Sequence, residues 1–130
     1  MIIGTGIDIV ETQRISRIID KWGTAFAKKI LANNEWAIFQ TQYQQSPQRA
    51  VDFLAKRFAA KEACAKAFGT GFRDGLAFTH IVISNDSLGK PQLSFRKQAK
   101  ILYQQQQINH SHLSLSDEKN SVVAMVILER

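Results

Sequence analysis

Two acidic residues interrupt otherwise apolar segments, and they are the residues of this sequence best suited to chemistry. Asp8 lies between two isoleucines in the stretch IIGTGIDIVE, whose composition predicts a buried strand over residues 2–11. Glu62 falls on the apolar face of a predicted helix, in line with Phe58 and Ala65. Because an unpaired buried carboxylate is costly, each acid must have a partner, face solvent or bind a cation.

A divalent cation would reconcile the two carboxylates if the fold brings them together. Side by side they repel, unless one holds a proton or a cation binds both. Mg²⁺ suits such a pair, because it takes oxygen ligands, typically one or two carboxylates, and leaves positions for water and substrate phosphates. On the alternation of the strand, Asp8 shares its face with Gly4 and Gly6, which would allow a ligand or another backbone to approach closely. Taken alone, Asp8 is better explained as a helix-capping or salt-bridged acid at the end of a strand.

Other polar residues nearby could contact a phosphate. Lys66 follows Glu62 by four residues, which is the spacing of a helical ion pair, and a lysine beside a metal-binding glutamate can stabilise charge as a phosphoryl bond breaks. The loop Gly69-Thr70-Gly71 is typical of a helix end and only weakly indicates a phosphate site. Near the C-terminus, polar residues alternate with leucines and share one face, which either binds a ligand or is solvated. These residues are His110, His112, Ser114 and Ser116.

The elements that must position these residues follow from local signals. Ser46 and Pro47 predict the start of a long central helix, which runs to Phe68 and ends at Gly69. Residues 11–22 predict an amphipathic helix whose apolar positions include Trp22, and two asparagines at 33–34 predict the cap of a further helix. Strands are predicted at 80–84 and 92–95, a helix at 96–107, and a β-hairpin over 110–129. The expected class is α+β, with a small antiparallel sheet packed against the long helix and shorter helices in one domain, residues 1–130.

Composition narrows the classes of protein that fit. The chain has 130 residues, 45% of them hydrophobic, which is enough for one core, and a net charge of +6 favours acidic or phosphorylated partners. The single cysteine, Cys64, excludes an intrachain disulfide and a cysteine-based zinc site, and it is expected in the core. No apolar run approaches the roughly 18 residues of a membrane span, and no signal peptide is evident. We therefore expect a cytoplasmic protein without a membrane partner.

Four segments together resemble one family. GTGIDIVE, FLAKRFAAKEACAKAFGTG, GKP and HLSLSDEKNSVVAMVILE occur in the order and at the spacing of the holo-[acyl-carrier-protein] synthases, small bacterial 4′-phosphopantetheinyl transferases. The resemblance extends over the whole chain, and its most specific part is the strand aspartate together with KEACAKAFGTG. It implies a Mg²⁺-dependent enzyme that transfers the phosphopantetheine arm of coenzyme A to a serine of apo-acyl carrier protein. The product would be adenosine 3′,5′-bisphosphate, and the pathway served would be fatty acid biosynthesis.

The resemblance also implies roles for individual residues. Asp8 and Glu62 would be the protein ligands of Mg²⁺, and Lys66 would contact the phosphates and assist the leaving group. His112 and the loop Gly69-Thr70-Gly71 would help to hold coenzyme A, and Arg57 would contact the nucleotide phosphates. The base that accepts the serine proton stays open between a metal-ordered water and one of the two carboxylates.

A basic first helix is the family's docking site for acidic carrier proteins. Here Arg14, Arg17 and Lys21 would form the basic face, with Ile18 and Phe26 as apolar anchors. The family also implies a homotrimer whose active sites lie between protomers.

Three other functions fit parts of the sequence. Nucleic-acid binding would suit the charge, but it predicts aromatic stacking positions among the basic residues, and no ribonucleoprotein motif is present. A carrier-binding module without catalysis is disfavoured because Asp8, Glu62 and Lys66 are all in place. A transferase that serves a polyketide or peptide synthetase is the third alternative. Such enzymes are typically longer and pseudo-dimeric, so this short chain favours the carrier protein of fatty acid biosynthesis.

Overall fold

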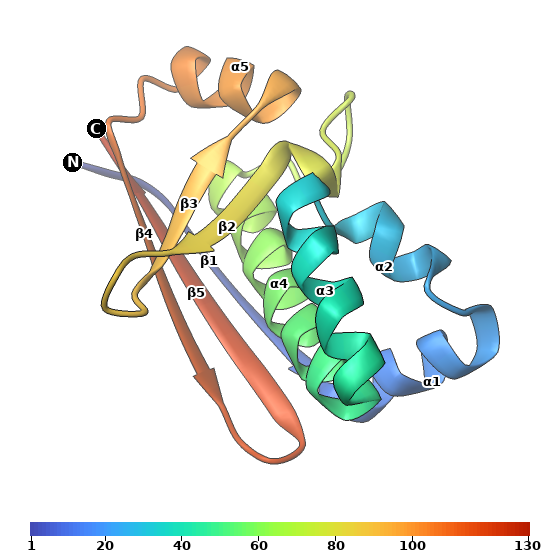
Figure 1. Cartoon of the computed structure of the whole chain (residues 1–130). Helices are drawn as coiled ribbons and strands as arrows, with labels where there is room; N and C mark the ends of the chain where they lie inside the picture. Colours follow the sequence, from blue (N-terminus) through green and yellow to red (C-terminus); the bar gives the residue numbers. More distant parts are fainter.

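A 22-residue helix, α4 (Pro47–Phe68), runs through the middle of the molecule in the computed structural model, which describes all 130 residues (Figure 1). It starts where the sequence predicts, since the Ser46 hydroxyl accepts a hydrogen bond from the Arg49 N–H at 3.4 Å. It ends at Gly69, whose φ of 83° is a left-handed conformation that glycine adopts without strain. The prediction of the central helix is therefore confirmed.

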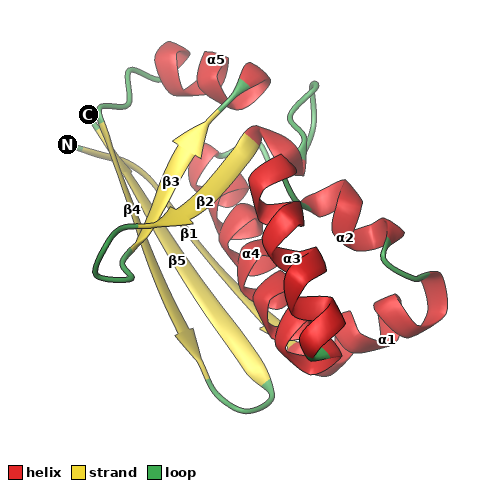
Figure 2. Ribbon diagram, in the orientation of Figure 1, coloured by secondary structure: helices red, strands yellow, loops and turns green.

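A three-stranded antiparallel sheet packs one face against α4 (Figure 2). Its strands are β1 (Ile2–Glu11), β5 (Ser121–Glu129) and β4 (His110–Asp117), in that spatial order. β4 and β5 form the hairpin that the sequence predicts, and β5 lies in the middle because β1 pairs with its other edge. The register sets Asp8 opposite Ala124 and Ile7 opposite Met125. Side chains of β1 thus alternate between the α4 side and an outer face.

The strands β2 (Ile81–Asn85) and β3 (Pro91–Phe95) form a separate hairpin. We expected one small sheet, and the structure divides it in two, because β3 lies near β4 without continuing its hydrogen-bond ladder. The remaining helices are α1 (Thr12–Trp22), α2 (Ala25–Ile30), α3 (Asn33–Gln45) and α5 (Lys97–Gln105), with a short 3₁₀ turn at Phe78–His80. In Figure 1, α1, α2 and α3 lie on the side of α4 away from the sheet.

Two local predictions were wrong. Trp22 was expected on the apolar face of α1, but it is 67% exposed, because Gly23 ends the helix and the Lys21 ammonium lies 5.2 Å from the indole ring centre. The asparagines at 33–34 were expected to cap α3. Instead the helix follows Ala32, whose N–H donates to the Glu35 carboxylate at 2.9 Å.

The core is one continuous cluster of 29 buried residues contributed by helices and strands of both hairpins. Cys64 is fully buried in it, as expected of a small core residue, and burial raises the pKa of its thiol. None of the helices is both long and apolar enough to cross a bilayer.

Candidate active site

Two glycines allow β1 to lie directly against α4. A Cβ atom on Gly6 would overlap the carbonyl oxygen of Ala63 and approach the Ala67 nitrogen to 2.8 Å, and one on Gly4 would overlap the Ala67 carbonyl oxygen. The strand alternation predicts that Asp8 shares the face of these glycines, and the structure confirms this. The backbone contact therefore presents Asp8 to the helical turns that carry Glu62 and Lys66.

Lys66 binds the strand rather than its own helix. Its ammonium donates to Asp8 Oδ1 at 3.1 Å and to the Ile7 carbonyl at 2.9 Å. The helical ion pair with Glu62 that the spacing predicts is not formed, because the strand offers two acceptors to one ammonium. Lys66 remains about half exposed, at 52% of its side chain, while the Asp8 side chain is only 16% exposed. The ammonium is thus accessible to a phosphate that approaches from solvent.

Glu62 is half-buried and is left without a hydrogen-bonded or ionic partner. Burial raises the pKa of its carboxyl group, and the nearby charge of Asp8 raises it further, whereas Lys66 and Arg14 act in the opposite direction. The structure therefore brings Asp8, Glu62 and Lys66 together. The negative charge of Glu62 is unfavourable there unless a cation binds it. No cluster of three or more His, Cys, Asp or Glu side chains occurs in the chain, so a cation here would take two protein carboxylates.

His112 and the glycine loop lie apart from this group within one chain. His112 is opposite Ile127 on the outer face of the sheet, whereas Asp8 faces α4, and β5 lies between their strands. The His112 ring shares a 2.6 Å hydrogen bond with Glu129, which lowers the pKa of that carboxyl group. In the loop that ends α4, the Thr70 hydroxyl donates to the Gly71 carbonyl at 2.8 Å.

Residues of the predicted docking face lie on α1 and at the start of α2. Arg14, Arg17 and Lys21 are exposed, and Ile18 and Phe26 are half-buried. Phe26 packs on Phe58 with ring centres 5.7 Å apart, and the Arg14 guanidinium lies 5.9 Å from the Phe58 ring centre. Because Arg14 also acts electrostatically on Glu62, the basic face reaches the edge of the carboxylate pair.

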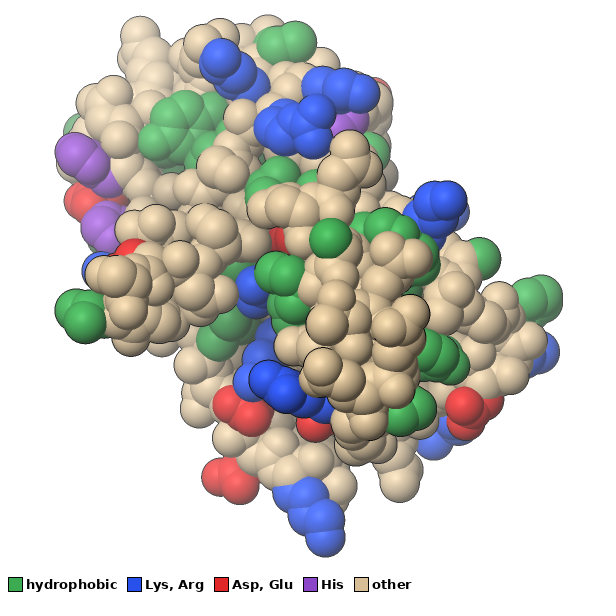
Figure 3. Space-filling view, viewed as in Figure 1, with side chains coloured by type: hydrophobic (Ala, Val, Ile, Leu, Met, Phe, Trp, Pro, Cys, Tyr) green, Lys and Arg blue, Asp and Glu red, His purple; other side chains and the backbone are tan.

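Basic side chains also follow a furrow beside α4, between the β2–β3 hairpin and α3 (Figure 3). Arg57 lies on this stretch of α4 and is only 6% exposed. Its Nη2 donates to Asn85 Oδ1 at 3.2 Å, and its Nε lies 3.8 Å from Glu35 Oε2.

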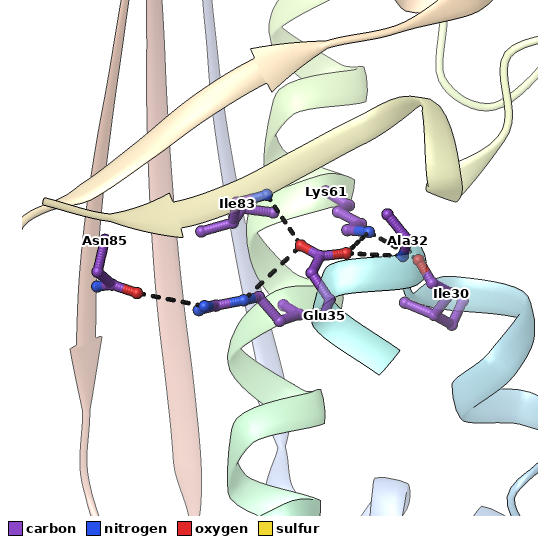
Figure 4. Close-up of polar contacts among 7 residues, drawn as sticks. Ile30, Ala32, Glu35, Lys61, Ile83 and Asn85 are labelled. Atoms are coloured by element: carbon purple, nitrogen blue, oxygen red, sulfur yellow. Dashed lines mark hydrogen bonds and ion pairs between the residues drawn. The ribbon is translucent and has the colours of Figure 1, made fainter. Parts of the chain in front are cut away.

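Glu35 and Lys61 form a fully buried ion pair that the sequence analysis missed (Figure 4). Lys61 donates to Glu35 at 2.6 Å and to the Ile30 carbonyl at 2.7 Å. Glu35 also accepts from the backbone of Ala32 and, at 2.8 Å, from that of Ile83 in β2. A signal was present in the sequence, since a glutamate in the first turn of a helix is well placed to accept free backbone N–H groups.

The chain belongs to the 4′-phosphopantetheinyl transferase superfamily, because the model of that family matches residues 4–126 and so nearly the whole fold described above. Within it the chain groups with the holo-[acyl-carrier-protein] synthases. One from Nitrosospira multiformis is 49% identical over 130 residues, covering 100% of both chains.

Solved structures agree with this assignment. The synthase from Neisseria meningitidis is 43% identical, with a TM-score of 0.88 over 100% of both chains. The synthase from Bacillus anthracis, solved in complex with CoA (3′,5′-ADP), is 38% identical, with a TM-score of 0.80 over 98% of this chain and 96% of that one. The resemblance read from the sequence and the expected α+β class are both confirmed.

Proposed function

We propose that this protein transfers the 4′-phosphopantetheine group of coenzyme A to a serine hydroxyl of apo-acyl carrier protein, in support of fatty acid biosynthesis. The other product is adenosine 3′,5′-bisphosphate. The observation that carries the proposal is the grouping of Asp8, Glu62 and Lys66 where β1 crosses α4, in a chain that matches holo-[acyl-carrier-protein] synthases from end to end. A related synthase bound to CoA supports coenzyme A as the donor. We assign the activity to one cytoplasmic domain, residues 1–130.

The residues present fit Mg²⁺ bound by Asp8 and Glu62. Both offer carboxylate oxygens, and Glu62 has no partner of its own, so its negative charge is unfavourable until a cation neutralises it. When bound, Mg²⁺ would neutralise charge on the pyrophosphate oxygens of coenzyme A during transfer.

The side chains of the site then have distinct tasks. Lys66 reaches the phosphates from solvent and stabilises the charge that develops on the leaving group. Arg57, His112 and the loop Gly69-Thr70-Gly71 bind and orient coenzyme A, so that the serine oxygen attacks in line. The serine proton goes to a water in the site or to one of the two carboxylates.

We further propose a homotrimer that packs through the outer face of the three-stranded sheet. Ile7 and Ile9 are 61% and 68% exposed on this face, and Met125 is 43% exposed beside them. An apolar sheet face of this kind usually marks a protein contact. His112 lies on the same face, so a neighbour packed there could complete the site of Asp8 and Glu62. Light scattering should give three times the chain mass, and a monomer would contradict this assembly.

Charge reversal on α1 tests the docking face. Replacing Arg14 and Arg17 together with glutamate should raise the KM for acyl carrier protein by at least about tenfold, because opposite charges become like charges across the interface. The Kd for coenzyme A, measured by calorimetry, should change far less. Losses of equal size for both substrates would show that α1 is not the docking face. Replacing Lys119, an exposed base of the β4–β5 turn, with glutamate is a matched control.

The activity itself is tested by the intact mass of apo-acyl carrier protein after incubation with this protein, coenzyme A and Mg²⁺. We expect the mass to rise by one phosphopantetheinyl group, and a chelator to prevent the rise. Folded protein that modifies no competent carrier would contradict the proposed function, and modification that persists in the chelator would contradict the metal site alone.

A further inference from the structure

We propose that Asn85 is a positioning residue for coenzyme A, because it fixes the Arg57 guanidinium in the orientation that meets a phosphate group of the coenzyme. The inference rests on the function proposed above. Asn85 is the last residue of β2, and its side-chain oxygen accepts the Arg57 hydrogen bond at 3.2 Å. In Figure 4, Asn85 lies at the open end of the row of polar contacts that runs inward to Glu35 and Lys61.

The Asn85 bond is the one side-chain hydrogen bond that orients Arg57. The guanidinium has five N–H donors, and its Nε is buried with no hydrogen-bond partner at all. The nearest acid, Glu35, is 3.8 Å from Nε, beyond hydrogen-bond distance. The Phe53 ring, centred 4.5 Å from Cζ, restrains the guanidinium on one side. Without Asn85, no hydrogen bond would hold the guanidinium against rotation about its own axis, and only the longer ion pair with Glu35 would remain.

The charges around Arg57 favour the binding of an anion. Glu35 faces two cations, and the closer one, Lys61, binds it at 2.6 Å with both groups fully buried. The other oxygen of Glu35 already accepts the Ile83 N–H. Arg57 therefore contributes positive charge that the chain does not fully neutralise, and buried charge is stable only when it is paired. A phosphate, with oxygens that match the guanidinium fork, is the fitting partner.

Asn85 also connects Arg57 with residues predicted to hold the coenzyme. Its amide nitrogen donates to the Gly89 carbonyl at 2.9 Å, inside the turn that joins β2 to β3. The next residue, Lys90, lines a hollow of about 420 Å³ together with His112. Asn85 thus links the Arg57 guanidinium to the turn that leads into this hollow. The phosphate that Arg57 meets is either the 3′-phosphate or the pyrophosphate of coenzyme A.

Replacing Asn85 with leucine tests the proposal, because leucine has a similar size and accepts no hydrogen bond. Asn85 is exposed, so the variant should fold. The Kd for coenzyme A should rise about tenfold, the size expected when a hydrogen bond to a charged group is lost, while kcat and the KM for acyl carrier protein stay unchanged. Ser84→Ala, which alters the exposed neighbour on the same strand, is the control and should leave all three values unchanged.

A double-mutant comparison separates the orientation of Arg57 from a merely structural role of the turn. In an Arg57→Met background, or in Arg57→Gln if the methionine variant is unstable, adding Asn85→Leu should have no further effect on the Kd for coenzyme A. A further tenfold loss in that background would overturn the proposal, as would an unchanged Kd in the single Asn85→Leu variant.

Dephospho-coenzyme A, which lacks the 3′-phosphate, identifies the phosphate. If the Asn85→Leu effect vanishes with this ligand, Arg57 meets the 3′-phosphate, and if it persists, Arg57 meets the pyrophosphate. Both results support the positioning role. Wild-type protein that binds coenzyme A but modifies no carrier would contradict the proposed function, and the binding comparison would still decide the role of Asn85.

Discussion

Replacing Glu62 with glutamine is expected to reduce transfer by at least about a hundredfold without unfolding the protein. Glutamine keeps the size of the side chain but removes the charge that would bind Mg²⁺. The melting temperature should stay equal or rise, because the substitution removes a half-buried carboxylate that has no partner and that is repelled by Asp8. A variant that loses activity while keeping stability marks a residue whose unfavourable placement serves binding or catalysis rather than folding.

The measurement combines three readouts: single-turnover transfer, thermal unfolding and calorimetric titration of Mg²⁺ in the presence of coenzyme A. Asp52→Asn is a matched control, since Asp52 lies on the same helix and binds Gln48 at 3.0 Å instead of facing Asp8. This control should retain wild-type transfer. Wild-type turnover by Glu62→Gln at saturating Mg²⁺ would contradict the assignment of Glu62 as a metal ligand.

The parts of the fold that the sequence predicted are those with local signals. α4 has a serine and a proline at its start and a glycine at its end, so its limits depend on neighbouring residues only. The placement of Asp8 on the face of Gly4 and Gly6 likewise follows from the alternation of one strand. Periodicity of this kind gives the face of a side chain, and for Asp8 and Glu62 that was enough to suggest a shared site.

Contacts between distant segments could not be predicted in this way. The Glu35–Lys61 pair joins residues 26 positions apart, and the Arg57–Asn85 bond joins residues 28 positions apart. Nothing in either local segment specifies the partner. Lys66 shows the same limit, because its spacing from Glu62 predicted a helical pair, whereas tertiary packing supplied two better acceptors on β1. The tertiary contacts of Lys66 with β1 therefore replace the weak ion pair with Glu62 that the helical spacing favours.

Gly6→Ala should lower the free energy of unfolding by about 3 kcal/mol, as overpacking of a tight contact does, and should also reduce transfer. The added methyl group would overlap the Ala63 carbonyl oxygen and crowd the Ala67 nitrogen, and both are backbone atoms that no side-chain rotation can move away. β1 would have to move away from α4, and Asp8, two residues further along the strand, would move with it relative to Glu62. Denaturant unfolding gives the stability, and transfer measured under conditions where the variant is fully folded gives the effect on the site.

Thr41→Ala is the control for this effect. Thr41 is exposed on α3, and its hydroxyl donates only to the Ala37 carbonyl of the same helix, so the substitution should change the free energy of unfolding by no more than about 0.5 kcal/mol and leave transfer unchanged. If Gly6→Ala has the stability and transfer rate of the wild type, then the close approach of β1 to α4 does not set the position of Asp8. If it loses both while Thr41→Ala loses neither, the glycine belongs to the catalytic geometry as much as to the fold, because the spacing that packs the strand on the helix is also the spacing between the two carboxylates.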